Sequence, residues 1–248
     1  MKIAILSDIH GNMIALNAVM DDIAKNGCEK TFFLGDYALA GPEPSPTVDY
    51  CMHLTSYENI EMIQGNTDKM IAEYSDELYN HVSESGAPIM ANALKEDASI
   101  LTDKQIEFLK TLPPYKLLEI EGVKILLVHG SPRRNNEDIL PTTPPEEVNE
   151  MVKDSEATII LCGHTHIPCG FQTISKKTVI NVGSVGRPFT DNAKSCYLIL
   201  DINDGKYTIE HKFVRYDNQK AAEILSKRTF EGADKLAKVL TNPTERHM

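Results

Sequence analysis

The sequence has 248 residues and a mass of 27.6 kDa, which is the length of one large domain or two small ones. Hydrophobic residues make up 42% and charged residues 25%, as in an ordinary globular protein, which argues against disorder over most of the chain. The formal net charge of −11 argues against binding to duplex DNA or to an anionic membrane. No apolar run approaches the roughly 20 residues that a membrane span needs.

The cysteines and the N-terminus together favour a cytoplasmic protein. Five cysteines, at positions 28, 51, 162, 169 and 196, are odd in number and show no Cys-x-x-Cys spacing. We expect them to be buried, reduced thiols rather than disulfides or metal ligands. Residues 1–8 turn polar too early for a secretory signal peptide.

The first quarter of the chain has the pattern of a β-α-β unit followed by a third strand. Short apolar runs at Lys2–Leu6, Lys30–Leu34 and Ile60–Ile63 predict buried strands. Between the first two runs, a helical stripe over residues 14–23 ends at Asn26-Gly27, a typical helix terminus. This order predicts parallel strands joined by a right-handed crossover.

The segment Lys69–Leu112 is predicted to be helical. Thr102 followed by Gln105 forms a capping box, and Pro113-Pro114 ends the last helix. Residues 70–112 form a cap-like segment beside the strands. We favour helices that simply cover the sheet over a mobile substrate lid, and both interpretations stay open at this stage.

The second half is dominated by predicted strands and closes with a helix. The strand ranges are Leu117–Ile120, Lys124–Val128, Thr158–Leu161, Gly170–Ile174, Thr178–Asn181, Tyr197–Asp201 and Tyr207–Arg215. Asn203-Asp204-Gly205 is a hairpin turn signal, and residues 219–240 read as one amphipathic helix. With no long linker in the sequence, we expect a single domain over residues 1–248, of α/β (α+β) class, with two packed sheets flanked by helices.

Chemically active side chains recur where five of the predicted strands end. Each of these strands finishes with Asp, Asn or His beside a glycine. The carboxyl ends of parallel strands gather at one edge of a sheet, so these side chains are expected in one crevice. The residues concerned are Asp8, His10, Asp36, Asn66, His129, His164 and His166.

These donors predict a metal site that accepts phosphate. Nitrogen and oxygen ligands without a thiolate suit divalent Mn, Fe, Zn or Ni. Two divalent cations would more than balance the two aspartates and leave a positive pocket, which favours a small phosphorylated substrate. A single Asp-x-His after a strand is usually only a turn or a helix N-cap. The prediction therefore depends on five such elements occurring together.

The order of these motifs resembles the calcineurin-like metallophosphoesterase superfamily, most closely its compact prokaryotic phosphodiesterase branch. The matching motifs are Asp8-x-His10, Gly35-Asp36, Gly41-Pro42, Gly65-Asn66-x-Asp68, His129-Gly130-Ser131-Pro132, Gly163-His164-Thr165-His166 and residues 181–188. The resemblance implies a metallo-dependent phosphatase-like, four-layer αββα sandwich of two mixed sheets. It also implies a hydrolase with two divalent metal ions, among which manganese is favoured for activity.

The resemblance also implies roles for individual residues. Asp8, His10 and His166 would hold the first metal, and Asn66, His129 and His164 the second. Asp36 would bridge the two, and a metal-bridging hydroxide would attack phosphorus in line. Asp36, Asn66 and His129 are thus the residues expected to be catalytic.

One position departs from the family pattern, because Thr67 stands where many members have histidine. Threonine cannot donate a proton near neutral pH. We therefore expect phosphodiester or phosphoanhydride bonds with good leaving groups, including dinucleoside polyphosphates, to be hydrolysed better than alkyl monoesters. A phosphomonoesterase or protein phosphatase is the second enzyme hypothesis. A metal-free scaffold of the same fold is the non-enzyme alternative.

Several further residues have two interpretations each. Arg133 is either an anchor for a second phosphate or, with Arg134, part of a solvated basic turn offset by Glu137 and Asp138. Asn12 is either a phosphate contact or, as we favour, a helix cap. Thr67 is a candidate substrate contact. A homo-oligomer is left open, with Tyr207–Arg215 and the final helix as candidate contacts.

Overall fold

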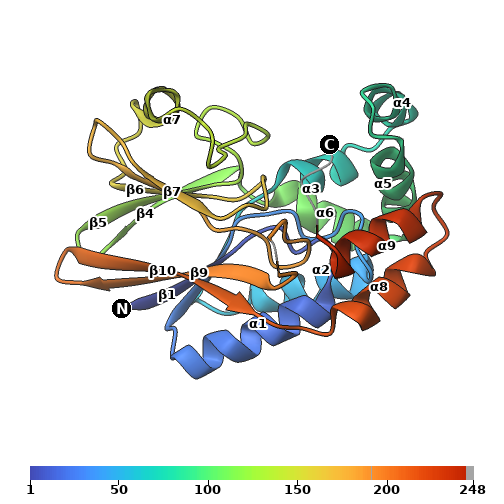
Figure 1. Ribbon diagram of the computed structural model, residues 1–248, viewed down its shortest axis with the longest axis horizontal. Helices are drawn as coiled ribbons and strands as arrows, with labels where there is room; N and C mark the ends of the chain where they lie inside the picture. Colours follow the sequence, from blue (N-terminus) through green and yellow to red (C-terminus); the bar gives the residue numbers. More distant parts are fainter. Residues whose placement is uncertain (191, 244–248) are drawn as a thin grey trace.

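The computed structural model describes residues 1–190 and 192–243, and two five-stranded mixed sheets form its centre (Figure 1). The first sheet has the order β10 (Lys206–Val214), β9 (Ser195–Asn203), β1 (Lys2–Leu6), β2 (Lys30–Phe33) and β3 (Ile60–Met62). In this sheet β1, β2 and β3 run parallel, whereas β9 is antiparallel to both β1 and β10. The predicted parallel start of the chain is therefore confirmed.

The second sheet repeats this mixture of directions. Its order is β4 (Tyr115–Ile120), β5 (Val123–Val128), β6 (Ile159–Cys162), β8 (Thr178–Asn181) and β7 (Cys169–Gln172). The central strands β5, β6 and β8 are parallel, and β4 and β7 are antiparallel edges. All ten strands of the described residues lie at or within two residues of the predicted ranges.

Helices cover the outer faces of both sheets, which gives the four-layer αββα arrangement (Figure 1). In the described part of the chain the helices are α1 (Met13–Asn26), α2 (Pro44–Leu54), α3 (Asn66–Ala72), α4 (Asp76–Glu84), α5 (Pro88–Ile100), α6 (Asp103–Thr111), α7 (Pro145–Val152), α8 (Asn218–Ser226) and α9 (Ala233–Thr241). The short α7 covers the outer face of the second sheet with Val148, Met151 and Val152, and the sequence analysis did not predict this helix.

The alternation of side chains along the strands explains the layers. In β1, Ile3 and Ile5 point into the core between the sheets, while Ala4 and Leu6 pack against the helices. In β5, Ile125 and Leu127 face the same inter-sheet core, whereas Leu126 and Val128 face α7. Strands buried on both faces read as continuous apolar runs, which is the pattern that the sequence shows.

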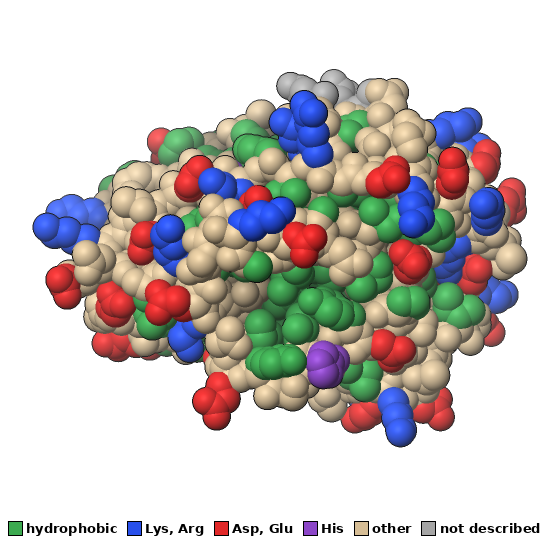
Figure 2. Space-filling model, turned by 90° about the horizontal axis from the view of Figure 1, so that it is seen from below, with side chains coloured by type: hydrophobic (Ala, Val, Ile, Leu, Met, Phe, Trp, Pro, Cys, Tyr) green, Lys and Arg blue, Asp and Glu red, His purple; other side chains and the backbone are tan. Residues whose placement is uncertain are grey.

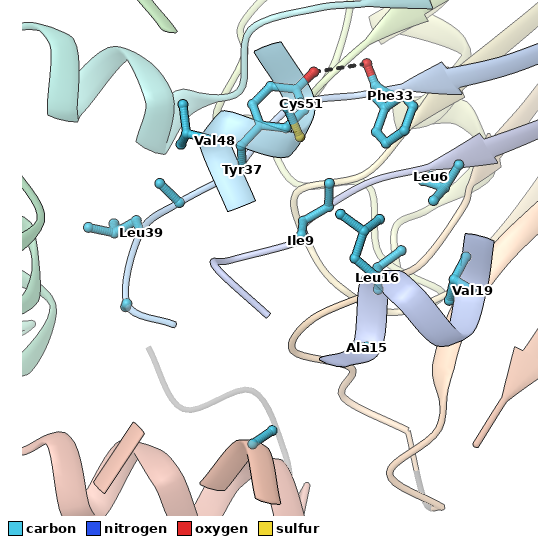
Figure 3. Close-up of a cluster of buried hydrophobic side chains, with 14 of the residues drawn as sticks. Leu6, Ile9, Ala15, Leu16, Val19, Phe33, Tyr37, Leu39, Val48 and Cys51 are labelled. Atoms are coloured by element: carbon cyan, nitrogen blue, oxygen red, sulfur yellow. Dashed lines mark hydrogen bonds between the residues drawn. The ribbon is translucent and has the colours of Figure 1, made fainter. Parts of the chain in front are cut away.

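The helical core also fixes the segment that follows β2. Figure 3 shows Tyr37 among Leu39, Val48 and Cys51, with its hydroxyl directed back toward Phe33. The Tyr37 hydroxyl donates to the Ile63 carbonyl at 2.9 Å, and it lies 3.5 Å from the Phe33 carbonyl. This buried side chain ties the segment after β2 to the end of β3.

Local signals at the helix ends are confirmed. Gly27 ends α1 in a left-handed conformation with φ of 67°, and Thr102 with Gln105 forms the capping box that begins α6. Asn12 caps α1 by accepting from the Ala15 N–H at 3.0 Å, which is the interpretation the sequence favoured. Asp204 and Gly205 form the turn between β9 and β10 with positive φ at both positions.

The predicted C-terminal helix over residues 219–240 is wrong as a single element. The structure has two helices, α8 and α9, and Gly232 between them adopts a φ of 96°. α8 already ends at Ser226, and Gly232 in its left-handed conformation is the N-cap at which α9 begins and packs back on α8. The segment predicted to be helical over 69–112 is confirmed as α3 to α6.

The outer surface carries no continuous basic field on the face seen from below. Figure 2 shows acidic and basic side chains interspersed around a hydrophobic area on that face. Among the described residues, no helix combines the length and the apolar character needed to cross a bilayer.

A buried ion pair joins the helical segment to the C-terminal helices. Arg228, which follows α8, donates to Asp97 of α5 at 2.6 Å and to the Gly41 carbonyl at 2.9 Å. Asp97 also accepts from the Ala40 N–H at 2.8 Å. The side chains of Arg228 and Asp97 are 7% and 0% exposed, so three distant segments meet at one desolvated contact.

We predict that Asp97→Ala lowers the free energy of unfolding by about 1–3 kcal/mol, because Arg228 and the Ala40 N–H lose their buried acceptor while Glu96 stays 3.4 Å from Arg228. Chemical denaturation measures this change. Asp21→Ala on the exposed face of α1 is the matched control and should change stability by no more than about 0.5 kcal/mol. Equal effects of the two substitutions would contradict the structural role of the pair.

Candidate metal centre

The loops that carry the predicted site residues adopt an unusual backbone conformation. Asp8, His10, Asp36, His164 and His166 all have positive φ, between 46° and 66°. This left-handed region costs a non-glycine residue about 1–2 kcal/mol. Residues held in such conformations cluster at functional sites, where the surrounding structure enforces them. Here they turn successive side chains toward one point at the strand ends.

Two glycines allow the loops to approach one another closely. A Cβ on Gly163 would lie 2.0 Å from the Ser7 hydroxyl and 2.6 Å from an Asp8 carboxylate oxygen. A Cβ on Gly65 would lie 2.0 Å from an Asp36 carboxylate oxygen. The motif glycines thus leave room for the two carboxylates.

Asp8, His10 and His166 form the first set of donors. The Nε2 atoms of His10 and His166 are 3.1 Å apart, and His166 Nε2 lies 3.3 Å from Asp8 Oδ1. Each imidazole uses its Nδ1 to donate to a backbone carbonyl, at 2.7 Å in both cases. In the neutral rings both Nε2 lone pairs therefore face each other, which favours a cation between them.

The protonation states of His10 and Asp8 also favour a cation at this position. Burial, with a further contribution from His166, lowers the pKa of His10 to about 4, so its ring is neutral near pH 7. Burial would raise the pKa of Asp8, but His166 and His129 outweigh it and lower the pKa to about 2. Asp8 Oδ1 is buried without a hydrogen bond from the described residues. An ionised, buried and unsatisfied oxygen beside two imidazole lone pairs fits a metal ligand.

Asn66, His129 and His164 form the second set. The Asn66 side-chain oxygen lies 3.0 Å from His129 Nε2 and 2.9 Å from His164 Nδ1. The Nδ1 of His129 donates to the Leu34 carbonyl at 2.6 Å, which leaves Nε2 directed inward. If both rings present lone pairs here, three acceptor atoms converge, which is an arrangement that a metal ion would satisfy.

Asp36 lies between the two sets. Its Oδ2 is 3.3 Å from His129 Nε2 and 3.7 Å from His10 Nε2. Its Oδ1 accepts from the Thr67 N–H at 2.9 Å. Burial would raise the pKa of Asp36, but the neighbouring His129 and His10 outweigh it and hold the pKa well below its usual range. One oxygen of this carboxylate thus faces both donor sets.

The seven residues predicted from strand ends are therefore brought together in one place. Their nitrogen and oxygen donors fit two divalent transition-metal ions. Geometry alone singles out two clusters of possible ligands, Asp8 with His10 and His166, and Asp8 with Asp36 and His129.

Cys162 and Cys169 instead direct their thiols toward the Ile180 and Ile139 carbonyls, as expected for packed cysteines.

Asp68 supports the site in a way that the sequence did not indicate. Its buried carboxylate accepts three backbone N–H groups, from Asp36 at 2.8 Å, Tyr37 at 2.9 Å and Gly65 at 2.8 Å. Burial and the Asp36 charge raise the pKa of Asp68 to about 7. Asp68 thus fixes the Asp36 loop to the start of α3. Its place in the Gly65-Asn66-x-Asp68 motif was the only signal in the sequence.

The three predicted substrate contacts lie in different settings. Thr67 borders Asp36, and its Oγ1 is buried without a hydrogen-bond partner among the described residues. Asn12 is fully buried, and its amide also donates to the Gly186 carbonyl at 2.9 Å. Arg133 donates to both carboxylate oxygens of Glu137, at 2.6 and 3.0 Å. Arg133 thus forms the ion-paired turn, and its contact with a second phosphate stays a prediction.

An apolar groove with two basic side chains adjoins the centre. It has a volume of about 340 Å³ and is lined by Ile89 and Met90 of α5, Leu236 of α9, and the basic side chains of Arg187 and Lys235. The Arg187 carbonyl accepts from His166 Nδ1, and Phe189 stacks on the His166 ring at 5.1 Å between centroids. The sequence did not predict this groove, because it joins segments about 100 and 50 residues apart.

Comparison with known proteins agrees with this geometry. Residues 1–205 match the family model described as the calcineurin-like phosphoesterase superfamily domain. The chain belongs to the calcineurin-like phosphoesterase superfamily. An uncharacterised protein of Methanocaldococcus jannaschii is 31% identical over 240 residues, which cover 91% of this chain and 92% of that protein.

Solved structures of several proteins share this fold. A hypothetical protein of Pyrococcus horikoshii matches with a TM-score of 0.85 and 23% identity, over 98% of this chain and 99% of that chain. A metallophosphoesterase of Sphaerobacter thermophilus matches with a TM-score of 0.78 and 21% identity, over 98% and 100% of the two chains. The Entamoeba histolytica protein Vps29, solved in complex with Zn²⁺, gives a TM-score of 0.50 at 16% identity, over 86% and 99%.

Metal uptake by this phosphoesterase-superfamily chain should release protons. Burial disfavours the charged His129 ring, but Asp36 and Asp8 outweigh it and raise the pKa to about 10. At pH 8 the metal-free ring is therefore protonated, and a metal at Nε2 must displace that proton. We predict release of about one proton per chain from this residue, and tighter metal binding as the pH rises toward 10. Calorimetric Mn²⁺ titrations at pH 8 in two buffers of different ionisation enthalpy measure the release. Heats that do not depend on the buffer would contradict the prediction.

Proposed function

We propose that this chain is a dinuclear metal-dependent phosphoesterase that hydrolyses phosphodiester or phosphoanhydride bonds of small molecules, with nucleotides as the favoured class. The observation that carries the proposal is that one Asp36 oxygen faces two sets of three donors, 3.3 Å from His129 and 3.7 Å from His10. Membership of the superfamily supports hydrolysis of a phosphoric ester in general.

The proposal assigns each ligand to one of two ions. Asp8, His10 and His166 would hold the first, while Asn66, His129 and His164 would hold the second, with Asp36 shared. When bound, two divalent cations polarise the phosphoryl oxygens and lower the pKa of the attacking water. Manganese is the ion that we favour for activity, because it accepts this mixture of carboxylate, amide and imidazole donors.

The chain's own contribution is to hold these donors in place before any ligand arrives. Backbone carbonyls fix the tautomer and the orientation of the His10, His129 and His166 rings. Asp68 fixes the Asp36 loop through three backbone N–H groups. Because the donors are preorganised, little rearrangement is needed when charge builds up on a phosphoryl group.

Thr67 limits the range of leaving groups. Its Oγ1 is buried without a hydrogen-bond partner among the described residues, and threonine does not act as an acid near neutral pH. An alkoxide leaving group needs a proton, whereas nitrophenolate or a phosphate leaving from an anhydride does not. This difference supports activated diesters and nucleotide anhydrides over alkyl monoesters.

The groove beside the centre supports a small organic substrate. Its volume of about 340 Å³ lies at the lower end of the range for small-molecule sites. The apolar side chains of Ile89, Met90 and Leu236 would contact the non-reacting half of the substrate.

We also propose a cytoplasmic location. All five cysteines have free thiols, which is in keeping with a reducing compartment. A homo-oligomer stays a prediction.

Asp36→Asn should reduce turnover of a nitrophenyl phosphodiester by more than about 100-fold, since even loss of a residue behind a metal ligand costs 10–100-fold. It should also lower the amount of bound Mn²⁺, because the shared carboxylate is lost. Steady-state kinetics and metal analysis of the purified protein measure the two effects. Asp21→Asn on α1 is the control for loss of one negative charge.

Retention of full activity by Asp36→Asn would refute its bridging role. A wild-type protein that binds Mn²⁺ but hydrolyses neither a nitrophenyl diester, a nitrophenyl monoester nor a dinucleoside tetraphosphate would indicate the scaffold alternative. Activity must be part of the test, because the similar Vps29 structure contains Zn²⁺.

Thr67→His should raise turnover of an alkyl phosphate monoester by roughly tenfold, because a general acid contributes about 10²–10⁴-fold where its geometry is optimal. Turnover of a nitrophenyl diester should change much less, since that leaving group needs no proton. Thr67→Ser keeps the hydroxyl and is the matched control. An equal change for both substrates would remove the leaving-group argument.

A further inference from the structure

The imidazoles of the metal centre are held by two different kinds of partner. Three of them donate from Nδ1 to a backbone carbonyl, at distances of 2.6 to 2.7 Å. The pairs are His10 with Leu39, His129 with Leu34, and His166 with Arg187. In each case the carbonyl accepts the Nδ1 proton, so Nε2 is the ring nitrogen that faces the centre.

His164 is the exception among the four. It faces the centre with Nδ1, which lies 2.9 Å from the Asn66 side-chain oxygen. Its Nε2 lies 3.2 Å from Oδ1 of Asp138. The partner on the far side of this ring is thus a carboxylate of another loop and not a backbone carbonyl.

The loop that presents Asp138 is held by an internal clamp. Glu137 accepts from the Ser131 hydroxyl and from the guanidinium groups of Arg133 and Arg134. The Arg133 and Arg134 contacts hold the pKa of Glu137 down at about 2, although burial opposes this, so the carboxylate is ionised at neutral pH. The next residue but one, Ile139, is 1% exposed in the core under α7. Asp138 is therefore fixed between a clamped residue and a buried one.

We propose that Asp138 is a positioning residue for His164, and that it sets the affinity of the second metal site. The inference rests on the proposed function in so far as His164 Nδ1 is a metal ligand there. In the metal-bound chain, a hydrogen bond from Nε2–H across this 3.2 Å contact would keep the Nδ1 lone pair directed at the centre. The negative charge also raises the basicity of the ring, which a neutral carbonyl does less strongly.

This arrangement makes the two metal sites unequal. In the first set of ligands, backbone carbonyls orient His10 and His166, and Asp8 accepts from the His164 N–H at 3.0 Å, so all three contacts involve main-chain groups that a side-chain substitution does not remove. In the second set, one ligand is oriented by a side chain that is 32% exposed. The clamp also assigns a structural role to Arg133 and Arg134, for which the sequence allowed two interpretations.

The test is Mn²⁺ binding to the full chain after removal of metals with a chelator. Asp138→Ala should weaken the second binding event by about 10–100-fold and leave the first unchanged. Asp138→Asn keeps a hydrogen-bond acceptor and loses the charge, so its effect should be smaller but in the same direction. Asp154→Ala, which removes an exposed acidic side chain after α7, controls for the loss of one negative charge and should leave both events unchanged.

A spectroscopic measurement separates orientation from general loss of structure. ¹⁵N NMR of the histidine rings in the Zn²⁺-loaded protein should show the proton of His164 on Nε2 in the wild type. In Asp138→Ala this tautomer should lose its preference, while His10 and His166 keep theirs. Unchanged Mn²⁺ affinity together with an unchanged His164 tautomer in Asp138→Ala would overturn the inference. A wild-type chain that binds no metal would instead overturn the proposed function.

Discussion

The crowding of electron-pair donors at one point is the constraint on which the rest of this structure depends. Two ionised carboxylates, an amide oxygen and four imidazole nitrogens face one another at distances near 3–4 Å, with Asp8 and Asp36 almost completely buried. Such an arrangement is repulsive unless positive charge lies among the donors. Protons on histidine supply some of that charge in the metal-free chain, as the raised pKa of His129 shows. Divalent cations would supply more of it at the same positions.

Bringing these donors together requires conformations that the chain would not adopt alone. Five of the seven residues lie in the left-handed region, at a cost of about 1–2 kcal/mol each. Three hydrophobic cores offset this cost, one between the sheets and one outside each of them. The helix-side core also contains loop residues such as Ile9, Ala38 and Leu39, so the strained loops are themselves anchored by buried apolar side chains.

The two residues that support the metal ligands, Asp68 and Asp138, differ in burial and in the number of groups they contact. Asp68 is fully buried and holds two loops through backbone N–H groups, so its role belongs to the fold as much as to the site. Asp138 is partly exposed and acts on a single ring. In this centre, main-chain carbonyls orient His10 and His166, whereas the orientation of His164 depends on the side chain of Asp138. That asymmetry is a property of the tertiary arrangement rather than of the ligand types.

The sequence by itself determined the strands, most helices and the identity of the seven donors. Period-two and continuous apolar patterns identify buried strands, and the parallel strands β1 and β2 bring Asp8 and Asp36 to one edge of the first sheet. His129 follows β5 of the second sheet, so its approach to Asp8 and Asp36 was decided by the packing of the two sheets. The turn at Gly232, the ion pair of Arg133 with Glu137, and the contact of Asp138 with His164 were decided only by the tertiary structure. The physical reason is that these features depend on side-chain direction. Which nitrogen of a ring faces the centre, and which carboxylate a guanidinium meets, follows from φ values and loop packing that no local pattern of residue types encodes.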